Sequence, residues 1–307
     1  MRTPSNLKPG DRIAIVSPAS PVKPEFIDGA ARFFLSEGFE PVVMPHAKGP
    51  ASGSYAASDA DRLDDLVRAY SDPAIKAILC ARGGYGCNHL LPLIPDTIIA
   101  DNPKWLIGFS DITALHALSL RAGVVSLHSP MARHLAELPP NHYCSRALTG
   151  ILSDGLPVEY NVAAHELSIP GEARGTLIGG NLAVFNGLAD TPFDPLRIPG
   201  SKILLIEDIS EQIYAVERMI IRLQLSGRLD EVTGIICGHF TEYRPDRNFK
   251  SMEQMIRARM DAAGWNRPLA MRFPSGHTDD NLPLPLGATA KLSVTDGKII
   301  LALSNPL

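Results

Sequence analysis

The chain has 307 residues, of which 45% are hydrophobic and 20% charged, as in globular proteins with a large buried core. The net charge is −4, and the sequence has neither a basic stripe nor an aromatic-and-arginine pattern for stacking bases, so we expect no nucleic-acid partner. No run approaches the roughly 18 apolar residues of a membrane span.

The beginning of the chain and its cysteines indicate a compartment. The first eleven residues contain no continuous apolar core of signal-peptide length before charges return, so we expect a cytoplasmic protein. The cysteines form no C-x-x-C pair, and three of them sit in or beside apolar runs, which favours buried structural thiols over a disulfide or a metal site. They are Cys80, Cys87, Cys144 and Cys237.

The first third of the chain alternates apolar runs with segments of helical spacing. This alternation predicts a mostly parallel sheet flanked by helices, with the layering of flavodoxin and Rossmann folds, whose ligands gather at the carboxyl ends of the strands. The spacing predicts strands over 12–18, 40–44 and 74–80, and helices over 24–38 and 59–70, the latter capped by Ser58.

A glycine-rich turn, Ala81-Arg-Gly-Gly-Tyr-Gly86, follows the third strand. Its glycines let the backbone approach a ligand closely and expose consecutive N–H groups, which suits an anion or an oxyanion. Phosphate binding is one interpretation, but the P-loop lysine and the G-x-G-x-x-G spacing are absent. A plain tight turn is the alternative.

The next apolar run, Trp105-Leu-Ile-Gly-Phe-Ser-Asp-Ile-Thr113, predicts a strand that turns sharply into a helix. Such a turn lifts the hydroxyl of Ser110 to the open end of the sheet and aims the following N–H at whatever bonds to it. Ser110 is therefore a candidate nucleophile. It also suits a helix N-cap, with Asp111 at the positive end of the dipole, and Ile112 replaces the second glycine of the hydrolase pattern G-x-S-x-G.

The remaining segments predict a second domain. A strand over 123–130 has His128 at its exit, where this residue either lines the same cleft or bonds to local backbone. Residues 137–170 show no long periodic element, and we interpret 151–171 as a linker between an N-terminal domain, 1–150, and a C-terminal α/β domain, 172–307. In the latter we expect a short helix after 175–181, strands over 202–206 and 233–237, helices over 213–227 and 251–263, and a hairpin over 291–303 with its turn at Asp296-Gly297.

A nucleophilic serine needs a base, and the base needs an acid to fix its tautomer. Glu207 and Asp208 are the acid candidates because they end a buried strand, although capping or ion pairing would also place them there. His239, at another strand exit, and His277, in a loop rich in turn-formers, are the base candidates. Spacing alone does not choose between them.

Five motifs in one order carry a resemblance that spans nearly the whole chain. They are Arg82–Gly86, Leu106–Ile112, Gly179–Asn181, Ile206–Asp208 followed by Tyr214 and Arg218, and Pro274–His277. In these motifs the chain resembles the serine LD-carboxypeptidases, which include murein tetrapeptide carboxypeptidases and the related microcin-immunity peptidases. The resemblance implies an N-terminal α/β domain, a smaller C-terminal α/β domain and a site between them.

The resemblance also implies the roles of the site residues. Ser110 is then the nucleophile, Glu207 the orienting acid and His277 the general base, and the substrate is a murein tetrapeptide that loses its terminal D-alanine. The N–H groups of Asp111 and Gly84 are the expected oxyanion hole.

Other features of the expected site follow from the same likeness. Arg82, Gly83 and Tyr85 are expected to contact the substrate, with Arg82 either holding its carboxylate or bracing the loop. We expect a small peptide as partner and neither metal nor cofactor. A homodimer is compatible with the sequence but not fixed by it.

Two alternatives remain open. One is a microcin-immunity-type peptidase that cleaves a peptidyl or aminoacyl nucleotide conjugate. Such enzymes place extra aromatic residues over the nucleotide, and Trp105 and Trp265 are the only tryptophans. The other is a non-catalytic, two-lobed binding protein for a small molecule.

Overall fold

The computed structural model describes residues 1–306, which divide into two compact units. Unit 1 comprises Met1–Leu156 together with Asn281–Gly287, and unit 2 comprises Pro157–Asp280 together with the chain from Ala288 onward. Each unit has its own β-sheet with associated helices, so the predicted α/β class is confirmed. Among the helices of residues 1–306, none combines the length and apolar character needed to cross a bilayer.

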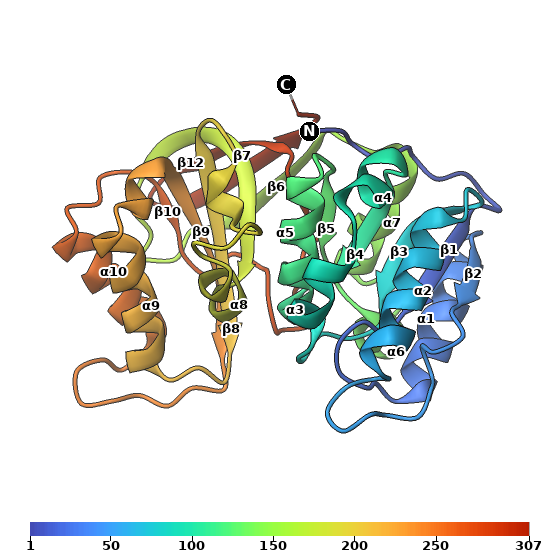
Figure 1. The fold of residues 1–307 in the computed structure, drawn as a ribbon. Helices are drawn as coiled ribbons and strands as arrows, with labels where there is room; N and C mark the ends of the chain where they lie inside the picture. Colours follow the sequence, from blue (N-terminus) through green and yellow to red (C-terminus); the bar gives the residue numbers. More distant parts are fainter. Residues whose placement is uncertain (307) are drawn as a thin grey trace. The chain divides into compact units, whose positions relative to one another are not determined.

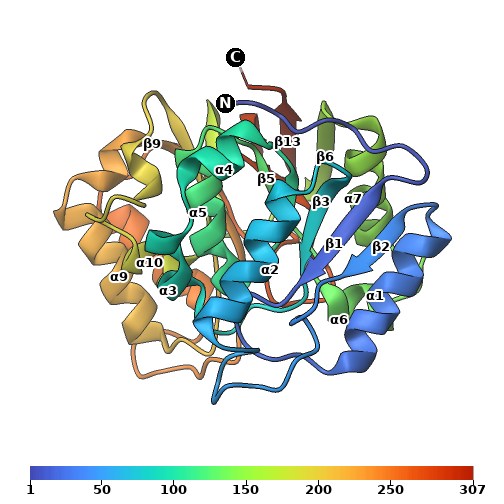
Figure 2. The same ribbon diagram turned by 45° about the vertical axis from the view of Figure 1, so that its right-hand side comes forward.

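Unit 1 is built around a six-stranded sheet (Figures 1 and 2). Its strands are β1 (Arg12–Val16), β2 (Glu40–Val43), β3 (Ile75–Cys80), β4 (Trp105–Gly108), β5 (Ser126–His128) and β11 (Leu284–Leu286). Their order is β11-β5-β4-β3-β1-β2, and all neighbours are parallel except β11, which pairs antiparallel with β5. The mostly parallel N-terminal sheet is therefore confirmed, with one late strand that the sequence analysis missed.

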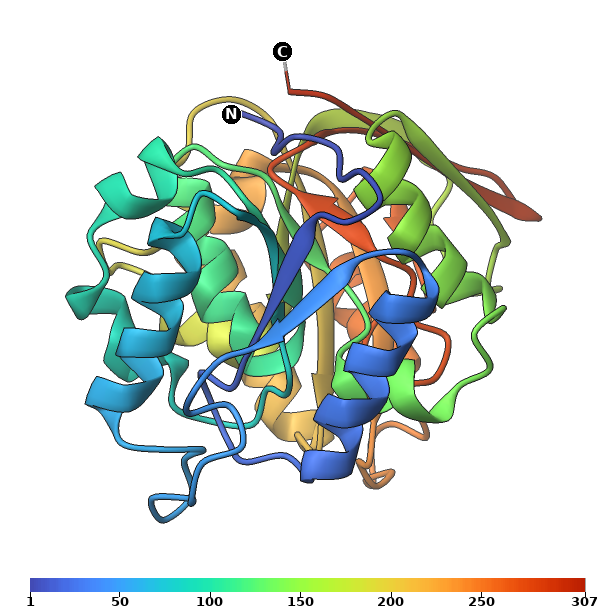
Figure 3. The same cartoon turned by 90° about the vertical axis from the view of Figure 1, so that its right-hand side faces the viewer.

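Helices cover both faces of this sheet. They are α1 (Pro24–Ser36), α2 (Asp59–Ser71), α3 (Cys87–Leu90), α4 (Asp96–Asp101), α5 (Thr113–Arg121), α6 (Ala132–Glu137) and α7 (Tyr143–Asp154). Figure 3 shows α2, α4 and α5 on one face, and α1 with α6 on the other. The predicted cap of α2 is confirmed, because the side chain of Ser58 accepts the N–H of Asp61. All residues of α5 from Thr113 to Leu120 are buried, so it is a core helix without a solvent face.

The segment from 137 to 170 is more ordered than its sequence pattern predicts. It contains α7 and a strand, β6 (Val158–Ala163). The expectation of no long periodic element was wrong, because Cys144, Leu148 and Ile151 are buried at the i, i+4, i+7 spacing of one helix face. Serine, threonine and glycine between them have modest helix propensity, which weakened the signal.

Unit 2 contains a seven-stranded mixed sheet in the order β10-β9-β8-β7-β12-β13-β6. Strands β7, β8, β9 and β10 are parallel to one another, whereas β12, β13 and β6 form an antiparallel extension beside β7 that includes the predicted hairpin at Asp296-Gly297. The strands besides β6 are β7 (Gly171–Asn181), β8 (Lys202–Ile209), β9 (Val232–Thr241), β10 (Leu269–Ala270), β12 (Thr289–Val294) and β13 (Lys298–Ser304).

Three helices accompany this sheet: α8 (Leu182–Gly187), α9 (Ile213–Leu225) and α10 (Met252–Ala262). Helix α9 packs against both α8 and α10 (Figure 1). The buried positions of α9 are Ile213, Val216, Ile220 and Leu223, which form one stripe along the helix.

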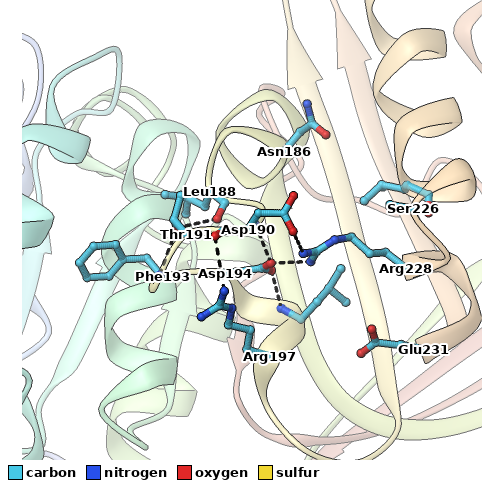
Figure 4. A network of polar contacts seen from close by, with 12 residues as sticks. Asn186, Leu188, Asp190, Thr191, Phe193, Asp194, Arg197, Ser226, Arg228 and Glu231 are labelled. Carbon is cyan, nitrogen blue, oxygen red and sulfur yellow. Dashed lines mark hydrogen bonds and ion pairs between the residues drawn. The ribbon is translucent and has the colours of Figure 1, made fainter.

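A charged network fixes the chain after α8 (Figure 4). The buried carboxylate of Asp194 accepts the N–H groups of Asp190 and Leu196 and pairs with the guanidinium of Arg228. Arg228 also pairs with Asp190 at 2.5 Å, and Arg222 reaches Asp190 at 3.1 Å. We interpret this network as structural, because its cations and carboxylates already neutralise one another.

Candidate active site

Ser110 lies in a strained turn between a strand and a helix. It begins a 3-10 turn, Ser110–Ile112, two residues after the end of β4, and α5 follows directly. Its φ of +66° is in the left-handed region, which costs a non-glycine residue on the order of 1–3 kcal/mol. The alternative of a capping serine was wrong, since Phe109 and Ile112 occupy the N-cap positions of the two helical segments. A strained serine at such a turn is the geometry of an exposed nucleophile.

The glycine turn lies directly against Ser110. A Cβ atom built on Gly83 would be 2.7 Å from the Cβ of Ser110 and 3.0 Å from the backbone nitrogen of Asp111. Only glycine therefore allows this approach without displacement. Gly84 follows with a φ of +104° and packs its backbone on Ser20. The two segments that the sequence analysis singled out meet at the same edge of the sheet.

Further bonds hold the turn in place. Ser20 donates its N–H to the carbonyl of Gly83 at 3.1 Å, and its hydroxyl oxygen accepts the N–H of Tyr85 at 3.1 Å. The buried carboxylate of Asp111 accepts the N–H of Cys87 at 2.8 Å and so ties the serine turn to the start of α3. Arg82 donates to the carbonyl of Pro21 at 2.7 Å, which is the bracing interaction considered above.

A buried histidine supports the strand that delivers the serine. His116, on α5, approaches the carbonyl of Gly108 with Nε2 at 2.8 Å and the hydroxyl of Ser126 with Nδ1 at 2.9 Å. Because a carbonyl only accepts, Nε2 carries the proton of the neutral ring. Burial lowers the pKa of His116 to about 4. His128 ends β5, fully buried, with its ring 5.7 Å from that of Phe109.

Unit 2 brings an acid and a base together. His277 Nδ1 lies 2.7 Å from Glu207 Oε2, and the glutamate is fully buried whereas the histidine side chain is 14% exposed. Since the carboxylate accepts, Nδ1 holds the proton and Nε2 is left with its lone pair, which is the tautomer a general base requires. Glu207 lies within β8 and not beyond its end, as the shorter predicted strand implied.

The electrostatics of this pair favour protonation of the imidazole. Burial by itself lowers the pKa of His277, but the charge and hydrogen bond of Glu207, with smaller contributions from Asp208 and Glu242, raise it above its usual value. The raised pKa means that these carboxylates stabilise the imidazolium form of His277 relative to the neutral ring.

Two glycines allow the histidine loop to approach the acid. A Cβ on Gly276, whose φ is +113°, would lie 2.8 Å from Glu207 Oε2, and one on Gly238 would lie 2.5 Å from the carbonyl of Ser275. His239, the other base candidate, lies within β9 and holds this loop by donating its backbone N–H to Ser275 at 2.8 Å. The structure therefore assigns the Glu207 partner to His277 and a backbone role to His239.

Asp208 faces a different set of partners. Its carboxylate accepts the side-chain amide of Asn181 at 2.7 Å and the N–H groups of Ala183 and Ile209 at 2.8 and 2.9 Å. Burial and the neighbouring charge of Glu207 raise the pKa of Asp208 to about 6, despite these bonds. Asp208 thus fixes the start of α8. Its side-chain partner, Asn181, belongs to the motif Gly179–Asn181 that the sequence already showed.

Other candidate groups lie outside this chemistry. All four cysteines are buried, and none forms a disulfide. Within residues 1–306, one group of side chains is close enough to share a metal ion, His46 with Asp64 and Asp65, which the sequence analysis missed. Asp65 already accepts the backbone N–H of His46 and contacts its ring at 3.0 Å, and Asp64 pairs with Arg68 at 2.7 Å.

Comparison with known protein families gives two matches. Residues 13–129 match the model of the LD-carboxypeptidase N-terminal domain, and residues 174–292 match that of the LD-carboxypeptidase C-terminal domain. Ser110 lies within the first range, and Glu207 and His277 lie within the second.

Individual relatives of the chain are proteins of the same kind. The chain is 33% identical to the murein tetrapeptide carboxypeptidase of Pseudomonas aeruginosa, over 92% of each protein. It is 27% identical to the microcin C7 self-immunity protein MccF of Escherichia coli, over 91% of this chain and 89% of that protein. The crystal structure of muramoyltetrapeptide carboxypeptidase from Oxalobacter formigenes superposes with a TM-score of 0.85 at 29% identity, covering 96% of this chain and all of the other.

Proposed function

Because the chain belongs to the LD-carboxypeptidase family and is a serine-type hydrolase of that class, we propose that it releases the terminal D-alanine from murein tetrapeptides. The observation that carries the proposal is the 2.7 Å contact between His277 and Glu207, an oriented imidazole in the tautomer of a base. The strained backbone of Ser110 is the matching feature of a nucleophile.

In the proposed reaction, Nε2 of His277 takes the proton of the Ser110 hydroxyl as its oxygen attacks the carbonyl carbon of the scissile bond. The imidazolium that forms is stabilised by Glu207, and it then protonates the leaving amine of D-alanine. Water, activated by the same imidazole, hydrolyses the acyl-enzyme and restores the serine. The mechanism requires Ser110 of unit 1 and His277 of unit 2 to act on one peptide bond.

The backbone at the serine turn supplies the expected oxyanion hole. We assign the donors to the N–H groups of Asp111 and Gly84, each worth roughly 3 kcal/mol of transition-state stabilisation. The close approach of Gly83 to both Ser110 and the nitrogen of Asp111 supports this assignment, because it puts the glycine turn beside the attacking hydroxyl. Arg82 and Tyr85 belong to the same turn and are the proposed contacts of the substrate. One N–H of Arg82 braces the carbonyl of Pro21, and its other guanidinium donors are the ones proposed to hold the terminal carboxylate.

The proposed setting is recycling of cell-wall peptides in the cytoplasm, where such tetrapeptides are the substrate. A homodimer is the proposed assembly. The murein tetrapeptide carboxypeptidase of Pseudomonas aeruginosa supports the peptide substrate.

A second candidate is cleavage of an aminoacyl or peptidyl nucleotide conjugate. The likeness to the microcin C7 self-immunity protein favours this candidate, because the 27% identity extends over 91% of this chain and 89% of that protein. The two candidates share the catalytic residues and differ only in the substrate that the site accepts.

The proposal is tested by incubating murein tetrapeptide with the wild-type protein and with the Ser110→Ala, Glu207→Gln and His277→Ala variants. Free D-alanine is measured, alongside a parallel assay with an aminoacyl sulfamoyl nucleoside. Wild type should release D-alanine, and Ser110→Ala and His277→Ala should each lower the rate by a factor on the order of 10³ or more. A Ser129→Ala variant, a buried serine of the same unit, is the matched control. Full activity of Ser110→Ala would refute the mechanism, and cleavage of the nucleoside alone would select the second candidate.

A further inference from the structure

Three aromatic rings cluster beside the glycine turn of unit 1. The ring centroid of Tyr85 lies 5.8 Å from that of Tyr55 and 5.6 Å from that of His89, and the last two lie 5.2 Å apart. Tyr85 is 52% exposed, and Tyr55 and His89 are each partly exposed. We call these three residues the aromatic ledge. A contiguous patch of aromatic rings with a polar rim is a feature of ligand-binding surfaces.

The ledge is held rigidly from beneath. The guanidinium of Arg62 lies 5.0 Å from the ring centroid of Tyr55 and donates to the carbonyl of Gly86 at 3.1 Å. Asp59 pairs with the ring of His89 at 3.3 Å. The backbone of Tyr85 is bonded to Ser20, as described above. A surface fixed in this way loses little conformational entropy when it binds a ligand.

The ledge also lies close to the proposed nucleophile. Gly83 contacts Ser110, and Tyr85 is two residues further along the chain, so its Cα lies at most about 7 Å from that of Gly83. The ring extends from there. The aromatic ledge therefore lies next to the turn that approaches Ser110.

The chemistry of the ledge selects among ligands. Two tyrosine rings offer faces for C–H groups, whereas the tyrosine hydroxyls and the His89–Asp59 pair offer hydrogen bonds at the edge. An ammonium group would compete with Arg62 for the face of Tyr55. A purely aliphatic chain would leave the polar edge without partners. A sugar ring has both apolar C–H faces and hydroxyl groups, and so matches both parts of the ledge.

Resting on the proposed function, we infer that Tyr55, Tyr85 and His89 bind the muramoyl sugar of a muramoyl-tetrapeptide substrate. Three residues separate the cleaved carbonyl from the sugar in such a substrate, an extended length of roughly 10 Å. This length carries the sugar past the serine turn to the ledge, while the D-alanine and the residue before it remain at Ser110.

The test compares N-acetylmuramoyl-tetrapeptide with the free tetrapeptide of the same sequence. Binding is measured by titration calorimetry in the Ser110→Ala background, which makes the result independent of cleavage. The muramoyl ligand should bind about three- to tenfold more tightly than the free peptide, as one aromatic stacking contact provides. Adding Tyr85→Ala should abolish this preference, and Tyr85→Phe should retain most of it. Tyr214→Ala, an exposed tyrosine of α9 at 59%, is the matched control and should leave the preference unchanged.

Equal affinities for the two ligands with Tyr85 intact, or a preference that survives Tyr85→Ala, would overturn the inference. Release of D-alanine by the wild-type protein is measured separately. Preference for the muramoyl ligand without any release would refute the proposed function and leave the ledge standing. Release without a preference would refute only the ledge.

Discussion

Replacing Gly83 with alanine places a methyl group against the proposed nucleophile. The added Cβ would be 2.7 Å from the Cβ of Ser110 and 3.0 Å from both its Oγ and the nitrogen of Asp111. Carbon atoms in contact usually lie about 3.5–4.0 Å apart, so one of the two segments must move by roughly 1 Å. The φ of Gly83 is outside the left-handed region, so alanine adds no backbone strain of its own.

A displacement of about 1 Å at the reacting group costs on the order of a hundredfold in turnover. Overpacking at one contact lowers the free energy of unfolding by about 1–3 kcal/mol, which leaves a protein of this size folded. We therefore expect Gly83→Ala to lower kcat for D-alanine release by about two orders of magnitude while the protein stays folded. The assay pairs D-alanine release with urea unfolding of the same preparation.

Gly150→Ala provides the matched control. Gly150 lies within α7 with nothing within 4 Å of an added Cβ, so alanine should raise stability by up to about 1 kcal/mol and leave kcat unchanged. A folded Gly83→Ala protein with kcat within about threefold of wild type would refute the placement of the glycine turn against the nucleophile.

Three further predictions concern charge. Asp208→Asn removes a charge that raises the pKa of His277, so the acid limb of the pH profile of kcat/KM should move to lower pH; an unmoved limb contradicts the electrostatic account. His116 has a folded-state pKa of about 4, below its unfolded value of about 6.5, so its contribution to stability is complete above pH 6.5 and is lost as pH falls toward 4. Urea unfolding should show that the free energy of unfolding of the wild-type protein falls between pH 6.5 and pH 4, and that this fall is smaller in His116→Gln by up to roughly 3 kcal/mol. The same dependence of the unfolding free energy on pH in both proteins would count against a neutral buried ring. Asp194→Ala leaves the largely buried guanidinium of Arg228 short of a partner and should lower the free energy of unfolding by about 3 kcal/mol, against at most about 1 kcal/mol for a surface ion pair; a loss within the surface range would show that the network is not structural.

The features that local chemistry dictates were predictable from sequence. The alternation of apolar runs and helical spacing gave the parallel sheet of unit 1, and the capping serine before α2 was read correctly. The turn at Ser110 was equally visible, because a glycine, a serine and an aspartate interrupt an apolar run at that point. Its left-handed backbone was not, since no residue type marks a strained serine in advance.

Features that depend on distant partners were not predictable. Strand β11 has three residues with a proline in the middle, and only its pairing with β5 makes it a strand. Spacing could not choose between His239 and His277 either. That choice depends on Gly238 and Gly276, whose missing side chains let the histidine loop reach Glu207.

The central claim is that Ser110 is activated by His277 and Glu207. The most direct measurement is labelling with a serine-reactive fluorophosphonate, followed by peptide mass spectrometry and the rate of labelling in wild type and in His277→Ala. The account predicts one adduct, on Ser110, formed at a rate that falls by a factor on the order of 10³ when the imidazole is removed. An adduct on another serine, or a Ser110 adduct that forms equally fast without His277, would contradict it.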